Sequence, residues 1–448
     1  MIFDQPDVRS VVRSRALLTD GRFFSLWLSQ GLSQTAQNAL LFSLLVIILG
    51  ITNSSIHTSF LILSFILPSI PLGFAVGVIL DRVNKGPILV LTNVLRAGAC
   101  VLLFFFHDNE WVIYAISTGI ATASLFFNPA VVALVPSVVR RDRLVQANSL
   151  YNFTLTGAQL LGIVFIAPIV LKSSGPDGMF ILGATMFGLA AVAAARVSVT
   201  HERSDVKPPQ RAIFASIPTE FRESWRALTG DRRSVMALAQ LIISSTLVLL
   251  FAILIPRYMR DVIHVPADSA ALVFAPTGIG ALVGLRFLPY FARKNKNRVV
   301  VIGLAGIAAC LVLLALVKPI ADVWESAPHA LDPSRFLRVS LLQALVMCFA
   351  GPMGFFYALL NAPAQTVLHE RAPPEMRGRI FATQVVSANF ISLVPLLLIG
   401  AITDILNVTV VLLIVAAIIG GMAALSRAME VEDAPDPVEE RMPQGVGT

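Results

Sequence analysis

Long apolar runs alternate with short polar gaps along almost the whole chain. Most runs are about 20 residues long, enough to cross a bilayer core of about 30 Å at a rise of 1.5 Å per residue. A helix on the surface of a soluble protein carries a polar face, and these runs lack one. The pattern predicts an all-α polytopic membrane protein.

We predict twelve transmembrane helices in two sets of six, separated by the longest internal polar stretch. The predicted spans are 23–50, 57–80, 86–106, 111–135, 146–171, 177–196, 234–256, 268–291, 299–317, 338–361, 383–405 and 407–426. An even number of spans places both chain ends on one side of the membrane.

The same pattern divides the chain into five segments. A cytoplasmic N-terminal segment at 1–22 precedes an N-terminal six-helix bundle at 23–196. A cytoplasmic central loop at 197–233 leads to a C-terminal six-helix bundle at 234–426. The tail at 427–448 is acidic and rich in proline, and we expect it to be disordered.

The two sets of six echo each other. Asn128-Pro129 lies in the last third of span 4, and span 10 ends at Asn361, close before Pro363. A polar break, an acidic residue and an arginine cluster follow each of them. Weak symmetry at this separation is typical of duplicated transporter folds, in which two pseudo-symmetric bundles rock about a site at the membrane midplane.

Composition and charge support the membrane assignment. The chain is 56% hydrophobic and 14% charged, against about 25% charged in soluble domains, and its mean hydropathy is +0.78. The net charge of +7 comes from basic residues in the short gaps rather than on one face, which argues against a nucleic-acid partner. The loops after even-numbered spans hold most of the arginines and lysines, which predicts that both termini are cytoplasmic.

The sequence offers little for enzyme chemistry. The three cysteines fall inside apolar spans, and the six histidines lie mostly in loops and at span ends. A phosphate-binding G-x-x-x-x-G-K-[ST] loop is absent from the sequence, so we expect no direct use of ATP. We expect no catalytic residue, no metal site and no cofactor.

Polar side chains inside the spans are the candidates for substrate contact, because an unpaired polar group in a bilayer is costly. Span 1 places amides at helical spacing on one side. The candidate cavity residues are Gln34, Gln37, Asn38, Arg96, Asn128, Asn152, Gln240, Tyr357, Asn361 and Asn389. A purely structural role is an equal alternative for the span-1 amides.

Arg96 lies about ten residues into span 3, near mid-bilayer. No carboxylate lies in the middle of any predicted span, so backbone carbonyls or a bound anion are its expected partners. Because the predicted interior holds this arginine and no carboxylate, we expect a neutral or anionic amphiphile as substrate rather than a cationic drug. In span 8, Gly280 and Gly284 predict a close helix contact at an interface that rocks during transport.

The stretch Gly77 to Lys85, G-V-I-L-D-R-V-N-K, resembles the loop between helices 2 and 3 of the major facilitator superfamily, G-x-x-x-D-R-x-x-[RK]. Around spans 4 and 10, Asn128-Pro129-Ala130 and Arg377-Gly378-Arg379 look like the macrolide and siderophore exporter branch. The segment from Asn38 to Phe42 is similar to the D-N-A-L-L-F stretch of bacterial lysophospholipid transporters, although Gln37 stands in place of the aspartate.

The resemblance implies a role for Gly77, Asp81, Arg82 and Lys85. Gly77 would let spans 2 and 11 approach closely, and the Asp81 carboxylate would meet the positive N-terminal end of span 11. Arg82 and Lys85 would add bonds that last only while the cytoplasmic side is shut. We expect this group to act as a conformational latch.

From the span pattern and the resemblance we expect a secondary active transporter in the bacterial inner membrane, exporting an amphipathic small molecule by alternating access. A lysophospholipid or lipid transporter of the same fold is the alternative. Expected partners are the lipid bilayer, a small-molecule or lipid substrate and a coupling ion, proton or sodium. We expect a monomer.

Overall fold

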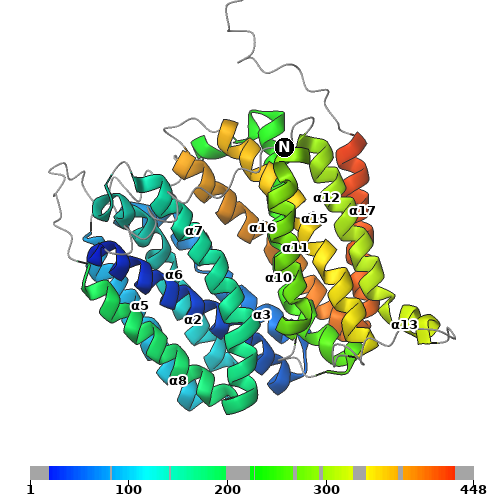
Figure 1. The fold of residues 1–448 in the computed structure, drawn as a ribbon, viewed down its shortest axis with the longest axis horizontal. Coiled ribbons are helices and arrows are strands. Elements are labelled where there is room, and N and C mark those ends of the chain that lie inside the picture. Colours follow the sequence, from blue (N-terminus) through cyan, green and yellow to red (C-terminus); the bar gives the residue numbers. More distant parts are fainter. Residues whose placement is uncertain are drawn as a thin grey trace, which may run out of the picture. The chain divides into compact units, whose positions relative to one another are not determined.

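A computed structural model describes residues 20–80, 83–140, 143–197, 222–226, 228–265, 270–291, 296–325, 340–371 and 377–428. Every regular element in these ranges is helical (Figure 1), which confirms the predicted all-α class. The chain forms two compact units: unit 1 comprises residues 1–275 and 371–411, and unit 2 comprises 276–370 and 412–448.

The structure gives the following helix bounds. Unit 1 contains α2 (Gly21–Thr52), α3 (Ser55–Ile66), α4 (Ser69–Leu80), α5 (Lys85–Phe106), α6 (Glu110–Val138), α7 (Leu144–Leu160), the π-helix η2 (Leu161–Ile166), α8 (Ala167–Ala195), α10 (Arg232–Tyr258), the π-helix η3 (Met259–Ile263) and α16 (Arg377–Ile405). Unit 2 contains most of α11 (Ala270–Phe291), α12 (Lys296–Ala315), α13 (Val317–Glu325), nearly all of α15 (Leu341–Arg371) and most of α17 (Val408–Ala428).

Ten helices in the described ranges are long and apolar enough to cross a membrane. One of these segments, Phe153–Ala195, is 43 residues long and contains Gly175 in a non-helical conformation with φ 65°. At 1.5 Å per residue it would measure about 65 Å, which is twice a bilayer core. This segment therefore has the length of predicted spans 5 and 6 together. Helix α11, a shorter apolar helix, matches span 8, and the count of twelve stays a prediction.

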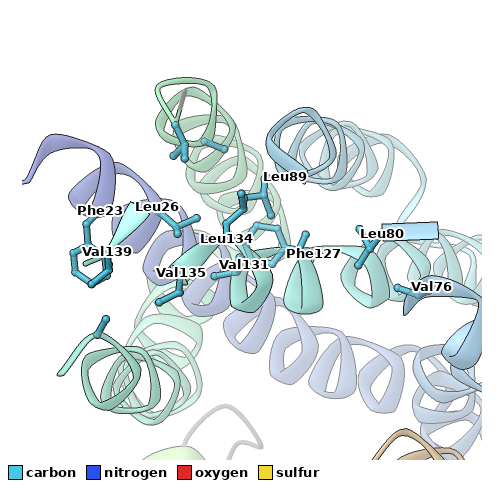
Figure 2. Packing of buried hydrophobic residues seen from close by; sticks show 14 residues of the cluster. Phe23, Leu26, Val76, Leu80, Leu89, Phe127, Val131, Leu134, Val135 and Val139 are labelled. Carbon is cyan, nitrogen blue, oxygen red and sulfur yellow. The ribbon is translucent and has the colours of Figure 1, made fainter. Parts of the chain in front are cut away.

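The helices α2, α5, α6 and α8 pack together and form part of the core of unit 1. Figure 2 shows the apolar cluster at one end of these helices, where Phe23, Leu89, Phe127 and Leu134 are buried together. Large apolar side chains from separate helices interlock here, which fixes the helix positions around the polar groups described below.

Two later helices, α10 and α16, belong to unit 1 because they pack against each other and against α3. Spans 7 and 11 are thus grouped with the first six. The division into bundles at 23–196 and 234–426 stays a sequence-based prediction. Residues 1–19, 198–221 and 429–448 lie outside the described residues, and with them most of the predicted N-terminal segment, central loop and tail.

In unit 2, the closest helix contact joins α11 to α15. A Cβ atom at Gly280 would overlap the carbonyl oxygen of Gly351, and one at Gly284 would lie 2.8 Å from the carbonyl oxygen of Phe355. The predicted close packing at Gly280 and Gly284 is therefore present. Its partner is α15, a helix of the same predicted half, so this contact is internal to that half.

Candidate functional site

One face of α2 carries amides that bond to α6. The Gln34 side-chain amide donates to Asn128 Oδ1 at 2.5 Å, and Ser124 Oγ donates to Gln37 Oε1 at 3.0 Å. The Asn38 amide donates to the Gln34 backbone carbonyl at 2.8 Å. We call these five residues, Gln34, Gln37, Asn38, Ser124 and Asn128, the amide face.

The spacing of the amides explains why they share a face. Residues three and four apart are neighbours on a helix surface, so positions 34, 37 and 38 line one side of α2. On α6, Pro129 follows Asn128 and cannot donate a backbone hydrogen bond, which leaves the carbonyl of Leu125 without its usual helical donor. Helix α6 therefore adds backbone polarity next to its side-chain amide.

The amide face is partly accessible, in contrast to the opposite side of α2. Gln34, Gln37 and Asn38 are half-buried and Asn128 is exposed, whereas Ala36 on the far side of α2 is fully buried. A ligand could therefore reach the amides without displacing the interior packing of unit 1.

Arg96 lies inside unit 1 and is 2% exposed. Its NH1 donates to Ser33 Oγ at 2.8 Å, and its guanidinium lies over the Phe127 ring at 4.4 Å and near the Phe187 ring at 5.3 Å. Among the described residues, no partner hydrogen-bonds to Nε or NH2. A hydroxyl and two ring faces thus take the place of the carbonyls that we expected as its protein partners.

The remaining predicted contacts are distributed over both units. Asn389 on α16 donates to Ser69 Oγ at 2.8 Å, next to the break between α3 and α4. Gln240 is buried on α10, and the side chain of Asn152 on α7 lies outside the described part. In unit 2, Asn361 donates to the Tyr357 hydroxyl at 3.2 Å. The structure therefore brings only part of the candidate set together.

The predicted cytoplasmic latch is only partly within the described residues. Asp81 and Arg82 lie outside them, the surroundings of Gly77 are not described, and Lys85 begins α5. Helix α4 approaches α16 one turn before Gly77, since a Cβ at Gly73 would lie 3.0 Å from the Val386 side chain. The role of Asp81 stays a prediction.

The sequence reasoning missed a polar junction at the other end of the same helix pair. Asp404, in the last turn of α16, binds the start of α3 and Arg257 of α10. A carboxylate in the last turn of a helix opposes the helix dipole, so its position at the end of span 11 was a signal that it needs positive partners.

A sequence model of the Major Facilitator Superfamily matches residues 26–331. The chain belongs to the Major Facilitator Superfamily. This match and the apolar helices make it a membrane-embedded, multi-pass transporter. The similar proteins described below are transporters, not enzymes.

Two bacterial relatives support the family assignment. The chain is 26% identical to the uncharacterized MFS-type transporter YjbB of Bacillus subtilis (strain 168), over 81% of this chain and 84% of that protein. It is 31% identical to the lysophospholipid transporter LplT of Pectobacterium carotovorum subsp. carotovorum (strain PC1), over 36% of this chain. The second match spans only 39% of LplT.

Solved transporter structures share the fold. The nucleoside transporter NupG has a TM-score of 0.69 at 11% identity, with 91% of this chain and 98% of that chain covered. The POT family transporter PepTSo has a TM-score of 0.69 at 13% identity, with 91% and 97% covered. At this level of identity the likeness concerns the fold alone.

Proposed function

We propose that this protein is a secondary active transporter that exports an amphipathic small molecule by alternating access. The observation that carries the proposal is the amide face, an uncharged hydrogen-bonding surface among apolar helices. An amphipathic ligand needs both properties: apolar walls for its body and a few polar groups that orient its head.

The hydrogen-bonding capacity of the face supports ligand binding. A carboxamide has two N–H donors and an acceptor oxygen, more than the bonds among these residues use. Because the groups carry no charge, they suit a neutral polar head. Arg96, Asn152, Gln240, Tyr357, Asn361 and Asn389 remain further candidate contacts under this proposal.

We propose a proton or sodium gradient as the energy source and a monomer as the working form. The absence of a phosphate-binding loop motif from the sequence supports an ion gradient over ATP. The arginine bias of the loops and the bacterial origin of the relatives support a bacterial inner-membrane protein with both termini in the cytoplasm.

The first experiment is a ligand panel on the purified protein in detergent, read as thermal unfolding. Macrolide-like and siderophore-like compounds are set against lysophospholipids. A ligand at 100 times its dissociation constant stabilises the bound state by about 2.7 kcal/mol, which gives a measurable rise in the midpoint. Stabilisation by drug-like amphiphiles alone supports the proposal, and no stabilisation by any of them contradicts it.

The amide face is then tested with Gln34→Ala and Asn128→Ala, each measured for ligand-induced stabilisation and for transport in proteoliposomes. Thr185→Val is the matched control, since the Thr185 hydroxyl is on α8 and donates to Ile181 of its own helix. We expect the two alanine variants to lose roughly tenfold in ligand affinity, as for one or two lost hydrogen bonds, and the control to keep it. Equal affinities in all three variants would exclude the amide face as the binding surface.

Lysophospholipid transport is the second candidate, and the partial similarity to LplT favours it. The segment from Asn38 to Phe42 supports the same reading. In that case the panel would respond to lysophospholipids alone. Arg96 would be the head-group contact, and it would have to become accessible in another conformational state.

A further inference from the structure

The carboxylate of Asp404 caps the beginning of α3. Ser54 Oγ donates to Asp404 Oδ2 at 2.5 Å, the Ser55 backbone N–H donates to Oδ1 at 2.7 Å, and the Ile56 N–H donates to Oδ2 at 3.1 Å. The first N–H groups of a helix have no partner within the helix, and they carry its positive dipole end. Asp404 of α16 supplies both the acceptors and the negative charge that this helix end needs.

Arg257 at the end of α10 joins the same junction. Its NH1 donates to Asp404 Oδ1 at 3.1 Å and to the Asn53 backbone carbonyl at 3.1 Å. Its Nε donates to Asp261 Oδ2 at 2.5 Å, which fixes the guanidinium. The side chains of Arg257 and Asp404 are 16% and 24% exposed, so the ion pair is partly shielded from water.

The helices also approach closely beneath the junction. A Cβ at Gly400 would lie 3.0 Å from the Ser55 carbonyl oxygen and would overlap the Ser59 hydroxyl. Ser59 is fully buried, and its hydroxyl donates to the Leu396 carbonyl at 3.0 Å. The junction therefore lies over a tightly packed, buried contact between α3 and α16.

The pairing joins parts of the chain that belong to different sets of spans. Helix α3 begins span 2 of the first six spans, whereas α10 and α16 are spans 7 and 11 of the last six. If the two sets rock against each other, as the proposed alternating access requires, the start of α3 must leave Asp404 when this end opens.

We propose that Asp404 is a positioning residue of the transport cycle, whose carboxylate holds the start of α3 against α16 and α10 and releases it when this end of the protein opens. The inference rests on the proposed alternating-access function. It also gives a physical counterpart to Asp81, which is expected to reach the start of span 11 at the opposite end. Spans 2 and 11 would each end in a carboxylate that caps the other.

The test measures accessibility without a substrate. Ser59→Cys is introduced into a Cys348→Ser background, where the remaining native cysteines, Cys100 and Cys310, are buried. The rate of modification by a membrane-impermeant maleimide is measured in intact cells or proteoliposomes. We expect Asp404→Asn to raise this rate roughly tenfold, because the charge-assisted bonds to α3 and Arg257 are lost.

Two further variants distinguish the loss of the α3 cap from the loss of the ion pair and from a general loss of negative charge. Asp108→Asn is the matched control, since Asp108 is an acidic residue outside the junction whose side chain is 99% exposed. The double variant Asp404→Arg with Arg257→Asp restores the ion pair, but an arginine cannot accept bonds from Ser55 and Ile56. We expect the double variant to stay as reactive as Asp404→Asn and the control to match the parent.

The outcomes are distinct. Unchanged labelling in Asp404→Asn overturns the inference, and restored protection in the double variant overturns the role of the α3 cap. Thermal midpoints in detergent are measured alongside. A raised labelling rate supports the role of Asp404 only where the variant keeps the parent midpoint. Arg257→Gln, which retains the cap, is expected to show a smaller rise and replaces Asp404→Asn if that variant does not fold. Altered labelling without a response in the ligand panel supports the role of Asp404 while contradicting the proposed substrate class.

Discussion

The contact of α11 with α15 gives a direct test of helix packing in unit 2. In Gly280→Ala the new methyl group would overlap the Gly351 carbonyl oxygen, far inside the ~3.5–4.0 Å of an optimal contact. The obstacle is backbone, so no side chain can rotate away and the helices must separate. Overpacking of this kind costs about 1–3 kcal/mol.

An opposing effect has to be subtracted. Alanine is favoured over glycine within a helix by about 0.5–1 kcal/mol, whatever its surroundings. Gly421→Ala measures this helix preference alone, because a Cβ at Gly421 meets nothing within 4 Å. We therefore expect Gly421→Ala to be neutral or slightly stabilising, and Gly280→Ala to lose a net ~0–2.5 kcal/mol.

Native cysteines provide the assay. Cys100 and Cys310 are buried and Cys348 is exposed, so in a Cys348→Ser background a thiol-reactive dye reports unfolding. The midpoint of dye fluorescence on heating should be lower for Gly280→Ala than for Gly421→Ala. Equal midpoints for the two variants would refute the close backbone contact.

Two other predictions concern charged groups of unit 1. Arg96→Met should keep or raise the thermal midpoint, since a buried cation with one neutral hydrogen bond and two ring contacts is replaced by an apolar chain of similar length; a fall of several degrees would show that the cation stabilises the fold. At the start of α10, burial tends to raise the pKa of Asp231, but the Ser234 hydroxyl, Arg371 and backbone N–H groups outweigh it and lower that pKa. The pKa of Asp231 in the folded protein is thus below its unfolded value. The ionised carboxylate therefore stabilises the fold above about pH 4, and this stabilisation is lost as the pH falls through the folded pKa. Asp231→Ala should cost about 0.5–2 kcal/mol at pH 7 and less at pH 3, and an equal cost at both pH values would contradict the assignment.

The local pattern was sufficient to predict the helices and much of the amide face. Apolar length identified the spans, and helical spacing placed Gln34, Gln37 and Asn38 on one side of α2. The close packing at Gly280 also followed from local sequence. Each of these features depends on residues within one or two helical turns, where geometry is nearly independent of the rest of the fold.

The partners across the fold could not be predicted in the same way. Asp404 and Ser55 are joined by a hydrogen bond although they are 349 positions apart, and no local period encodes that pairing. Arg96 was expected near carbonyls or an anion, and the structure surrounds it with Ser33 and two phenylalanines from α6 and α8. Such contacts depend on which helices become neighbours, which only the folded chain determines.

The left-handed glycine in α8 has a consequence for insertion into the membrane. If Gly175 adopted helical dihedrals and the helix continued straight, the 43-residue segment would be a rod too long for one bilayer crossing and with no return. In the proposed topology, every later helix would then cross in the reverse sense, and the loops predicted to lie on one side would lie on the other. The proposed sidedness of the second half of the transporter therefore depends on the backbone torsion of Gly175.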